Sequence, residues 1–167
     1  MNNYPSNINM SKSFNQGFTL IELMVVVVVI AILAAITIPS YQHFVRRGIA
    51  AQAQQEIQKL AEQLERHKAR NFSYRGFNAD YLYTGVTGFT SSSQTLILNP
   101  TYTLTIVDSM TGNPLLTSST ATGRGWAIRA LSSDGKNYSF LLTSTGLNCK
   151  NKTAANVSYT GCGVGQE

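Results

Sequence analysis

The sequence predicts an α+β fold in which one long N-terminal helix packs on an antiparallel sheet of about four strands. Three observations lead to this prediction. An apolar run with a single charge opens the chain, an amphipathic helical pattern follows it, and the second half alternates apolar and polar residues between turn signals. The 167 residues carry a net charge of +5. This mildly basic balance favours acidic partners without requiring them.

The apolar run covers residues 18–38, and Glu22 is its only charge. As a helix with a rise of about 1.5 Å per residue, the run would be about 31 Å long, which is enough to cross a bilayer. An acid inside such a segment costs a few kcal/mol, so its presence indicates a function. The residues alone leave open a cleaved secretory signal and a plain membrane anchor, although the anchor does not explain Glu22.

The helical pattern continues through residues 40–71 as an amphipathic segment. Pro39 separates it from the apolar run of residues 18–39, removes one backbone hydrogen bond and is expected to kink the helix. Glutamine and glutamate side chains occupy one face, and apolar side chains recur at steps of four and three on the other. That apolar stripe consists of Ile49, Ala53, Ile57, Leu60 and Leu64.

A loop rich in Gly, Ser and Tyr is predicted for residues 72–93, and residues 94–167 supply the sheet and a terminal loop. Asp134-Gly135 is a two-residue hairpin signal between two alternating segments. Gly112-Asn113-Pro114 marks another turn. The predicted strands are residues 94–98, 102–107, 125–132 and 136–143.

Cys149 and Cys162 are the only cysteines in the chain. Their spacing matches no zinc or redox motif, so a disulfide formed in an oxidising compartment is the simplest interpretation. It would close a loop of roughly 14 residues and contribute about 3 kcal/mol. Two unpaired buried thiols remain the alternative.

The first part of the chain closely resembles the class III signal and helix of type IV pilins and pseudopilins. The residues that carry the resemblance are Lys-Ser-Phe-Asn-Gln-Gly at 12–17, Phe-Thr-Leu-Ile-Glu-Leu-Met-Val at 18–25 and the segment 30–41. In that family a prepilin peptidase cuts after the glycine and methylates the new amino terminus. The resemblance therefore implies that residues 1–17 are a leader, that cleavage falls between Gly17 and Phe18, and that Phe18 is N-methylated. It also implies that Glu22 neutralises the amine of an adjacent subunit during assembly.

The resemblance further implies the type IV pilin fold, of the type IVa class, with residues 18–39 as a transmembrane and assembly helix. The chain is most similar to minor pilins of the PilE type, whose cysteines bound a loop near the C terminus. A leader of 17 residues is longer than type IVa leaders, so Met10 is a candidate for the true start. N-terminal sequencing of the uncleaved precursor tests this hypothesis.

The partners implied by the resemblance are other pilin subunits, a prepilin peptidase, an inner-membrane assembly platform and, before assembly, inner-membrane lipid. The implied location is the inner membrane of a Gram-negative bacterium, with a periplasmic C-terminal domain, and later an extracellular pilus. Arg46 and Arg47 follow the span and oppose this orientation by the positive-inside rule. The family and the cysteines favour the periplasm.

The function implied is that of a structural subunit of a type IV pilus, as a minor pilin that supports pilus assembly and thereby motility, adhesion or DNA uptake. The alternatives are a DNA-binding pilin of a competence system and a type II secretion pseudopilin. His43 and His67 are isolated, and no catalytic triad, metal-ligand spacing or phosphate-binding loop stands out. No enzymatic activity, metal or cofactor is expected.

The DNA-binding alternative depends on basic residues that alternate with Phe72, Tyr74 and Phe77. Such a pattern can contact phosphates and stack bases. The simpler interpretation is a solvated helix end followed by a packed loop. The residues expected to contact DNA are Arg70, Arg75, Lys150 and Lys152.

Overall fold

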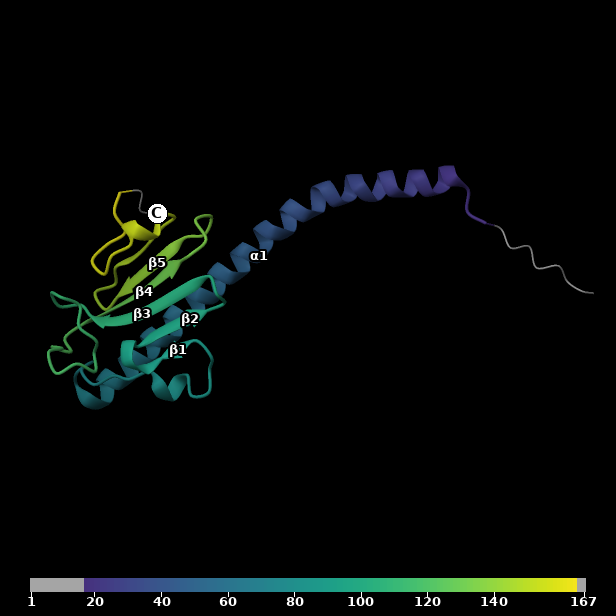
Figure 1. Ribbon diagram of the computed structural model, residues 1–167. Coiled ribbons are helices and arrows are strands. Elements are labelled where there is room, and N and C mark those ends of the chain that lie inside the picture. Colours follow the sequence, from purple (N-terminus) through teal and green to yellow (C-terminus); the bar gives the residue numbers. More distant parts are fainter. Residues whose placement is uncertain (1–16, 165–167) are drawn as a thin grey trace, which may run out of the picture. The chain divides into compact units, whose positions relative to one another are not determined.

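The computed structural model describes residues 17–164, which divide into two compact units, one ending at Tyr41 and the other beginning at Gln42. The helix α1 (Leu20–Asn71) contributes residues to both units. All six strands belong to the second unit (Figure 1).

The N-terminal end of α1 is capped by Thr19. Its side-chain oxygen accepts a hydrogen bond from the Glu22 amide at 3.3 Å, as in a typical N-cap. Glu22 thus lies in the first turn, where the helix dipole favours a negative charge. The apolar part of α1 reaches a mean hydropathy of 3.0 over 18 residues with none of them buried, so its length and composition suffice to cross a membrane. Pro39 lies inside α1, and the kink expected there remains a prediction.

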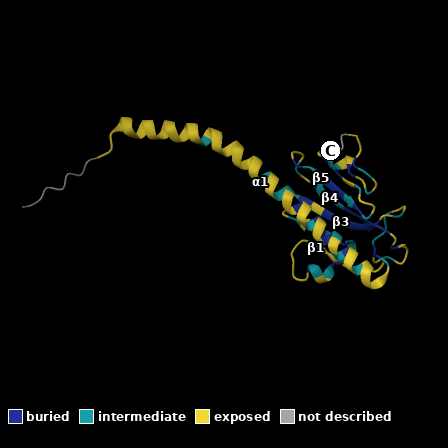
Figure 2. Cartoon of the chain, turned by 180° about the vertical axis from the view of Figure 1, so that it is seen from behind, coloured by how far each residue is buried: buried dark blue, intermediate teal, exposed yellow. Residues whose placement is uncertain are grey.

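The second part of α1 lies across one face of the sheet, and its buried face is the predicted one. Ala53, Ile57, Leu60 and Leu64 are buried, and Ile49 is partly buried against the same core. Figure 2 shows the resulting change from exposed to buried positions along the helix. The amphipathic pattern is therefore confirmed.

The sheet contains six antiparallel strands in the order β1-β2-β3-β4-β5-β6. Four of them match the predicted strands within a few residues, and the two edge strands were not predicted. β1 is only two residues long and β6 is polar, so neither gives an alternating pattern. The bounds are β1 (Phe89–Thr90), β2 (Thr95–Leu98), β3 (Tyr102–Asp108), β4 (Trp126–Ser132), β5 (Ser139–Thr143) and β6 (Asn148–Asn151).

The hairpin between β4 and β5 is confirmed, but its predicted two-residue turn is wrong. Residues 133–138 connect the strands, and Ala130 pairs with Phe140. The turn is formed by Asp134, whose carbonyl accepts from the Asn137 amide at 2.9 Å and whose side chain accepts from the Lys136 amide at 2.9 Å. Aspartate side chains commonly stabilise such turns by bonding to the backbone two residues on.

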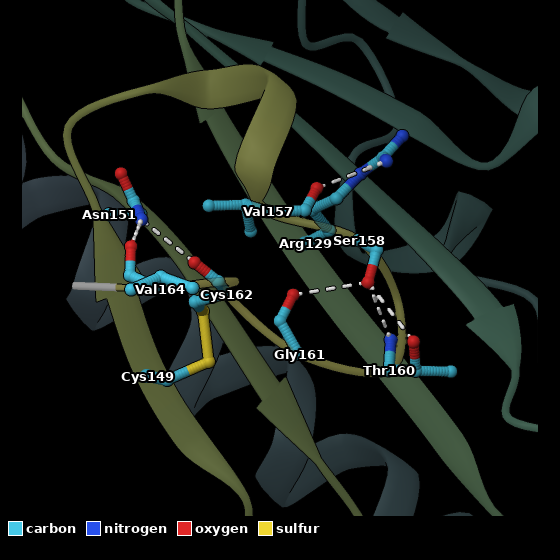
Figure 3. The surroundings of a disulfide bond; sticks show 9 residues. All are labelled: Arg129, Cys149, Asn151, Val157, Ser158, Thr160, Gly161, Cys162 and Val164. Carbon is cyan, nitrogen blue, oxygen red and sulfur yellow. Dashed lines mark hydrogen bonds between the residues drawn. A yellow bond between two sulfur atoms is a disulfide. The ribbon is translucent and has the colours of Figure 1, made fainter. Parts of the chain in front are cut away.

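The two faces of the sheet are covered by different parts of the chain. The first core contains the α1 stripe together with Tyr102 and Trp126. The second contains Val157 and the disulfide between Cys149 and Cys162, which joins β6 to the C-terminal segment. Figure 3 shows this segment folded over the sheet, where the Asn151 side chain donates to the Cys162 carbonyl at 2.8 Å. The predicted disulfide and α+β fold are confirmed.

Candidate nucleic-acid interface

The site begins where α1 ends. Phe72 adopts a left-handed conformation with φ 57°, and its amide donates to the Lys68 carbonyl at 2.7 Å. The Asn71 side chain donates to the His67 carbonyl at 2.9 Å. The exposed helix end thus has two of its last carbonyls satisfied by the chain itself.

The turn after α1 is fixed to the loop that precedes β4. The Gly123 carbonyl accepts from the Tyr74 amide at 2.9 Å and from the Ser73 hydroxyl at 3.2 Å. The Gly123 amide donates to the side chain of Asp108 at 2.8 Å, and Asp108 is fully buried. These bonds bring Arg124, which follows Gly123, to the segment that carries Phe72.

The basic side chains at this end differ in how far they are neutralised. Arg66 forms an ion pair with Glu62 at 2.5 Å. Arg75 donates to the Ser119 carbonyl at 2.8 Å, a neutral partner. Within residues 17–164 the ion pairs belong to Arg66 and Lys59, so the charges of Arg70, Arg75 and Arg124 are not balanced by an acid in contact. We call these three residues the helix-end arginines.

Sequence reasoning missed Arg124. It lies between two glycines and far along the chain from Arg70, and no sequence pattern links the two. The hydrogen bonds of Gly123 in the structure reveal that they share one end of the unit. The one sequence signal that could have pointed to Arg124 is that it is a basic residue between two glycines.

The aromatic residues that alternate with the basic ones do not all face the solvent. Tyr74 and Phe77 are buried in the first core, so the expectation that they could stack bases is wrong. Burial raises the pKa of the Tyr74 hydroxyl, which donates to Glu65 at 2.8 Å. Trp126 donates to the same carboxylate at 3.1 Å. Phe72 is the exception, with 91% of its surface exposed.

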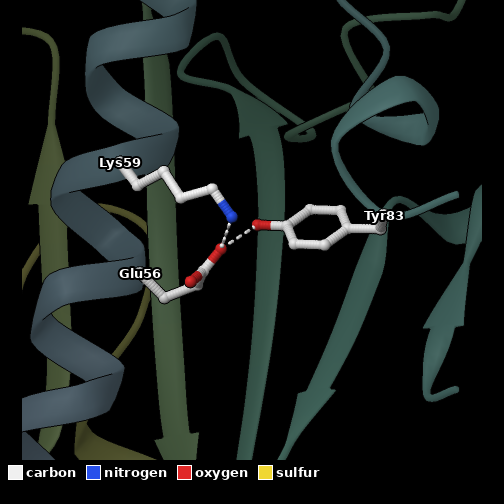
Figure 4. A network of polar contacts seen from close by, with 3 residues as sticks. All are labelled: Glu56, Lys59 and Tyr83. Carbon is white, nitrogen blue, oxygen red and sulfur yellow. Dashed lines mark hydrogen bonds and ion pairs between the residues drawn. The ribbon is translucent and has the colours of Figure 1, made fainter. Parts of the chain in front are cut away.

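The loop after α1 is held against the helix by polar contacts. The Tyr83 hydroxyl donates to Glu56 at 2.5 Å, and Lys59 contacts the same oxygen at 2.9 Å (Figure 4). Burial, followed by the bond to Glu56, raises the pKa of Tyr83. Further along, hydrogen bonds from Ser91 and Asn78 lower the pKa of Asp80. These contacts therefore fix the loop against the middle of the second part of α1.

Lys150 and Lys152 form a second basic feature on β6 and the residues after it. Their ammonium groups lie 4.9 and 5.2 Å from the centre of the Tyr138 ring. The sheet order places β6 at the edge opposite β1, whereas Arg70 and Arg75 belong to the end of α1 and the turn after it. The four expected DNA contacts thus lie in two separate features.

The predicted processing site lies at the start of the described chain. Gly17 and Phe18 precede α1, and Phe18 is exposed. Glu22 follows in the first helical turn. Lys12 and the candidate start Met10 lie outside the described residues.

Two protein families match the chain over adjoining stretches. Residues 12–38 match the family described as the prokaryotic N-terminal methylation motif. Residues 39–163 match the family described as type IV minor pilin ComP, DNA uptake sequence receptor. The second match covers more than half of the chain, including the whole sheet and the disulfide.

Curated relatives match over shorter stretches. The chain is 46% identical over 54 residues to a type IV major fimbrial protein FimA of Dichelobacter nodosus. The matched stretch makes up 32% of this chain and 35% of that protein. Another FimA of this organism is 45% identical over 80 residues, which is 46% of this chain and 47% of the relative. Fimbrial protein EcpC of Eikenella corrodens is 52% identical over 44 residues, which is 26% of this chain and 29% of the relative.

The chain thus spans less than half the length of these curated relatives. No solved structure matches it. The long N-terminal helix, the antiparallel sheet and the C-terminal disulfide agree with the two family matches. The chain is a type IV pilin that belongs to the ComP minor pilin, DNA uptake sequence receptor family.

Proposed function

We propose that this protein is a minor subunit of a type IV pilus that binds DNA for uptake. The proposal is carried by one observation: the part of the chain that matches the ComP family is the unit that bears the helix-end arginines, whose charges no contacting acid in the described residues balances. This coincidence favours a DNA-binding pilin over a type II secretion pseudopilin. The proposed role is binding and assembly, without an enzymatic step.

The chemistry of the proposed interface is electrostatic. Arginine offers several N–H donors that bind two phosphate oxygens at once, and it stays charged at any physiological pH. Each phosphate that is neutralised releases condensed counterions, so binding weakens as salt rises, with a slope of about −0.9 per contact on double-stranded DNA. The lysines beside Tyr138 provide a second place where the backbone of a longer DNA can be held.

The test is DNA binding by residues 42–167, which contain both cores, measured at several salt concentrations. Replacing the three helix-end arginines by glutamine should weaken binding and reduce the salt slope by about 2–3. Replacing Lys150 and Lys152 by glutamine should reduce it by about 1–2. A matched control replaces Arg46, Arg47 and Lys136, which removes the same charge elsewhere.

Two outcomes would contradict the proposal. If the control variant loses as much affinity as the helix-end variant, the site is wrong and only net charge matters. If the wild type binds DNA no better than an unrelated protein of equal charge, DNA uptake is not its function. Selection from a random-sequence pool then tests the sequence preference that the family description implies.

We further propose that the N-terminal segment is processed and assembled in the manner of its family. The supporting observations are the methylation-motif match and the exposed apolar helix that carries Glu22 in its first turn. The peptidase would cut between Gly17 and Phe18 and methylate Phe18. The helix would hold the subunit in the inner membrane of a Gram-negative bacterium, with the second unit in the periplasm. An assembly platform would then transfer it to a filament of pilin subunits.

The proposed role of Glu22 gives a direct test. A free amine and a carboxylate are each costly in an apolar filament core, and pairing them offsets much of that cost. Glu22→Ala should leave cleavage and methylation of Phe18 intact, as seen by mass spectrometry, but lower the amount of subunit in sheared pili. Glu62→Ala, which removes an exposed acid of the second unit, serves as control. Normal incorporation of the Glu22 variant would refute this role.

A further inference from the structure

Phe72 combines two unfavourable properties. It adopts φ 57°, a left-handed conformation that favours glycine over residues with a side chain. In addition, 91% of its surface is exposed, so packing within the fold does not compensate for the strained backbone. A large apolar side chain held outward at a strained position is a pattern found at functional sites.

The surroundings of Phe72 suit a nucleotide. The helix-end arginines flank it along the chain and across the Gly123 contact, and no acid in the described part of the chain pairs with them. A polar hollow of about 230 Å³ lies at the same helix end and is lined by Arg66, His67, Arg70 and Asn71, the residue before Phe72, together with Gln63 and Tyr81. A phosphate that enters this hollow would bring its nucleotide to the helix end that carries Phe72.

We infer that Phe72 is an aromatic stacking residue that takes up the face of a nucleobase beside the helix-end arginines. This inference rests on the proposed DNA-binding function and adds a contact that is not electrostatic. The base can come from a single strand, where stacking on aromatic side chains is common, or from a duplex step that the ring wedges open. Salt weakens the arginine contacts but leaves this contact in place.

The experiment uses the full chain in detergent micelles and DNA that carries the fluorescent base 2-aminopurine. Phe72→Leu keeps an apolar side chain and the backbone strain but has no ring, and it should weaken binding about tenfold. Phe72→Gly removes the ring and also the strain, so it should weaken binding similarly while melting at an equal or higher temperature. Phe72→Trp should bind at least as tightly as the wild type. The fluorescence change on binding should be lost in the leucine and glycine variants.

Controls separate the possible outcomes. Ile97→Ala removes an exposed apolar side chain from the sheet and should leave binding unchanged. Single-stranded, duplex and mismatched DNA are compared, and a larger effect of Phe72→Leu on the mismatched duplex than on the paired one identifies a wedge. If the wild type binds DNA and the leucine variant binds equally well, the inference is overturned and the DNA-binding function stands. If the wild type does not bind DNA, the proposed function itself fails.

Discussion

Replacing Gly123 by alanine should destabilise the second unit more than replacing any exposed glycine. Gly123 has a φ of +65°, and an added Cβ would meet the Ser73 hydroxyl at 2.3 Å and the Arg75 amide at 2.5 Å. The left-handed conformation costs an L-residue about 1–2 kcal/mol. Crowding of packed atoms costs about 1–3 kcal/mol more. We therefore expect a loss of about 2–5 kcal/mol in the free energy of unfolding.

Two other glycines separate these contributions. Gly112 has a φ of +88° but open space around its Cβ position, so Gly112→Ala should cost only the conformational part, about 1–2 kcal/mol. Gly135 has neither constraint, and Gly135→Ala should change stability by about 0.5 kcal/mol or less. The assay is urea unfolding of residues 42–167, followed by the fluorescence of Trp126, the only tryptophan in the chain.

The outcome that refutes the reasoning is a Gly123 variant that is no less stable than the Gly112 variant. Steric contact at Gly123 would then be relieved by movement of the turn after α1. Because that turn carries Phe72 and Arg75, such a movement should still disturb DNA binding. Binding by the Gly123 variant, measured below its unfolding transition, therefore reports whether the position of the turn matters to the site.

Further predictions concern the disulfide and the buried phenol of β3. Replacing Cys149 and Cys162 by alanine should lower the free energy of unfolding by about 3 kcal/mol, because a loop of roughly 14 residues is no longer closed; a loss below about 1 kcal/mol would argue against this account. Burial raises the pKa of Tyr102 to about 12, and its hydroxyl donates to the Tyr138 carbonyl at 2.6 Å. The folded state therefore favours the neutral phenol, whose stabilising effect is complete below the unfolded pKa of about 10 and is lost as the pH rises towards 12. The free energy of unfolding should fall more steeply between about pH 9 and 12 in the wild type than in Tyr102→Phe, which keeps only the contributions of the other buried phenols, and equal declines would contradict this prediction.

Periodic features could be predicted well from the sequence because many residues contribute to each. The stripe from Ile49 to Leu64 repeats over several helical turns, and the strands at the centre of the sheet alternate over five to seven residues. The disulfide was predictable because the chain has only two cysteines. The helical stripe follows from burial of one face of α1, and the alternation in the strands follows from side chains that point to opposite faces of the sheet.

Features that depend on one contact could not be predicted. The turn at Asp134 depends on side-chain bonds to the backbone rather than on a conformation that requires glycine at position 135. The pattern of basic and aromatic residues after α1 did not distinguish Tyr74, whose ring packs in the core, from the exposed Phe72. Arg124 joins the site through the contacts of a single glycine, far away in the sequence.

The order of the strands has a consequence for how the chain folds. Each strand pairs with its neighbour in the sequence, and the longest connection between paired strands is residues 109–125 between β3 and β4. Contacts between nearby segments form fast because little chain must be closed into a loop. The sheet can therefore grow from β1 towards β6 in the order in which the strands follow one another along the chain. Oxidation of the cysteines, which join β6 to the segment after it, would then be the last step and would lock a sheet already in register.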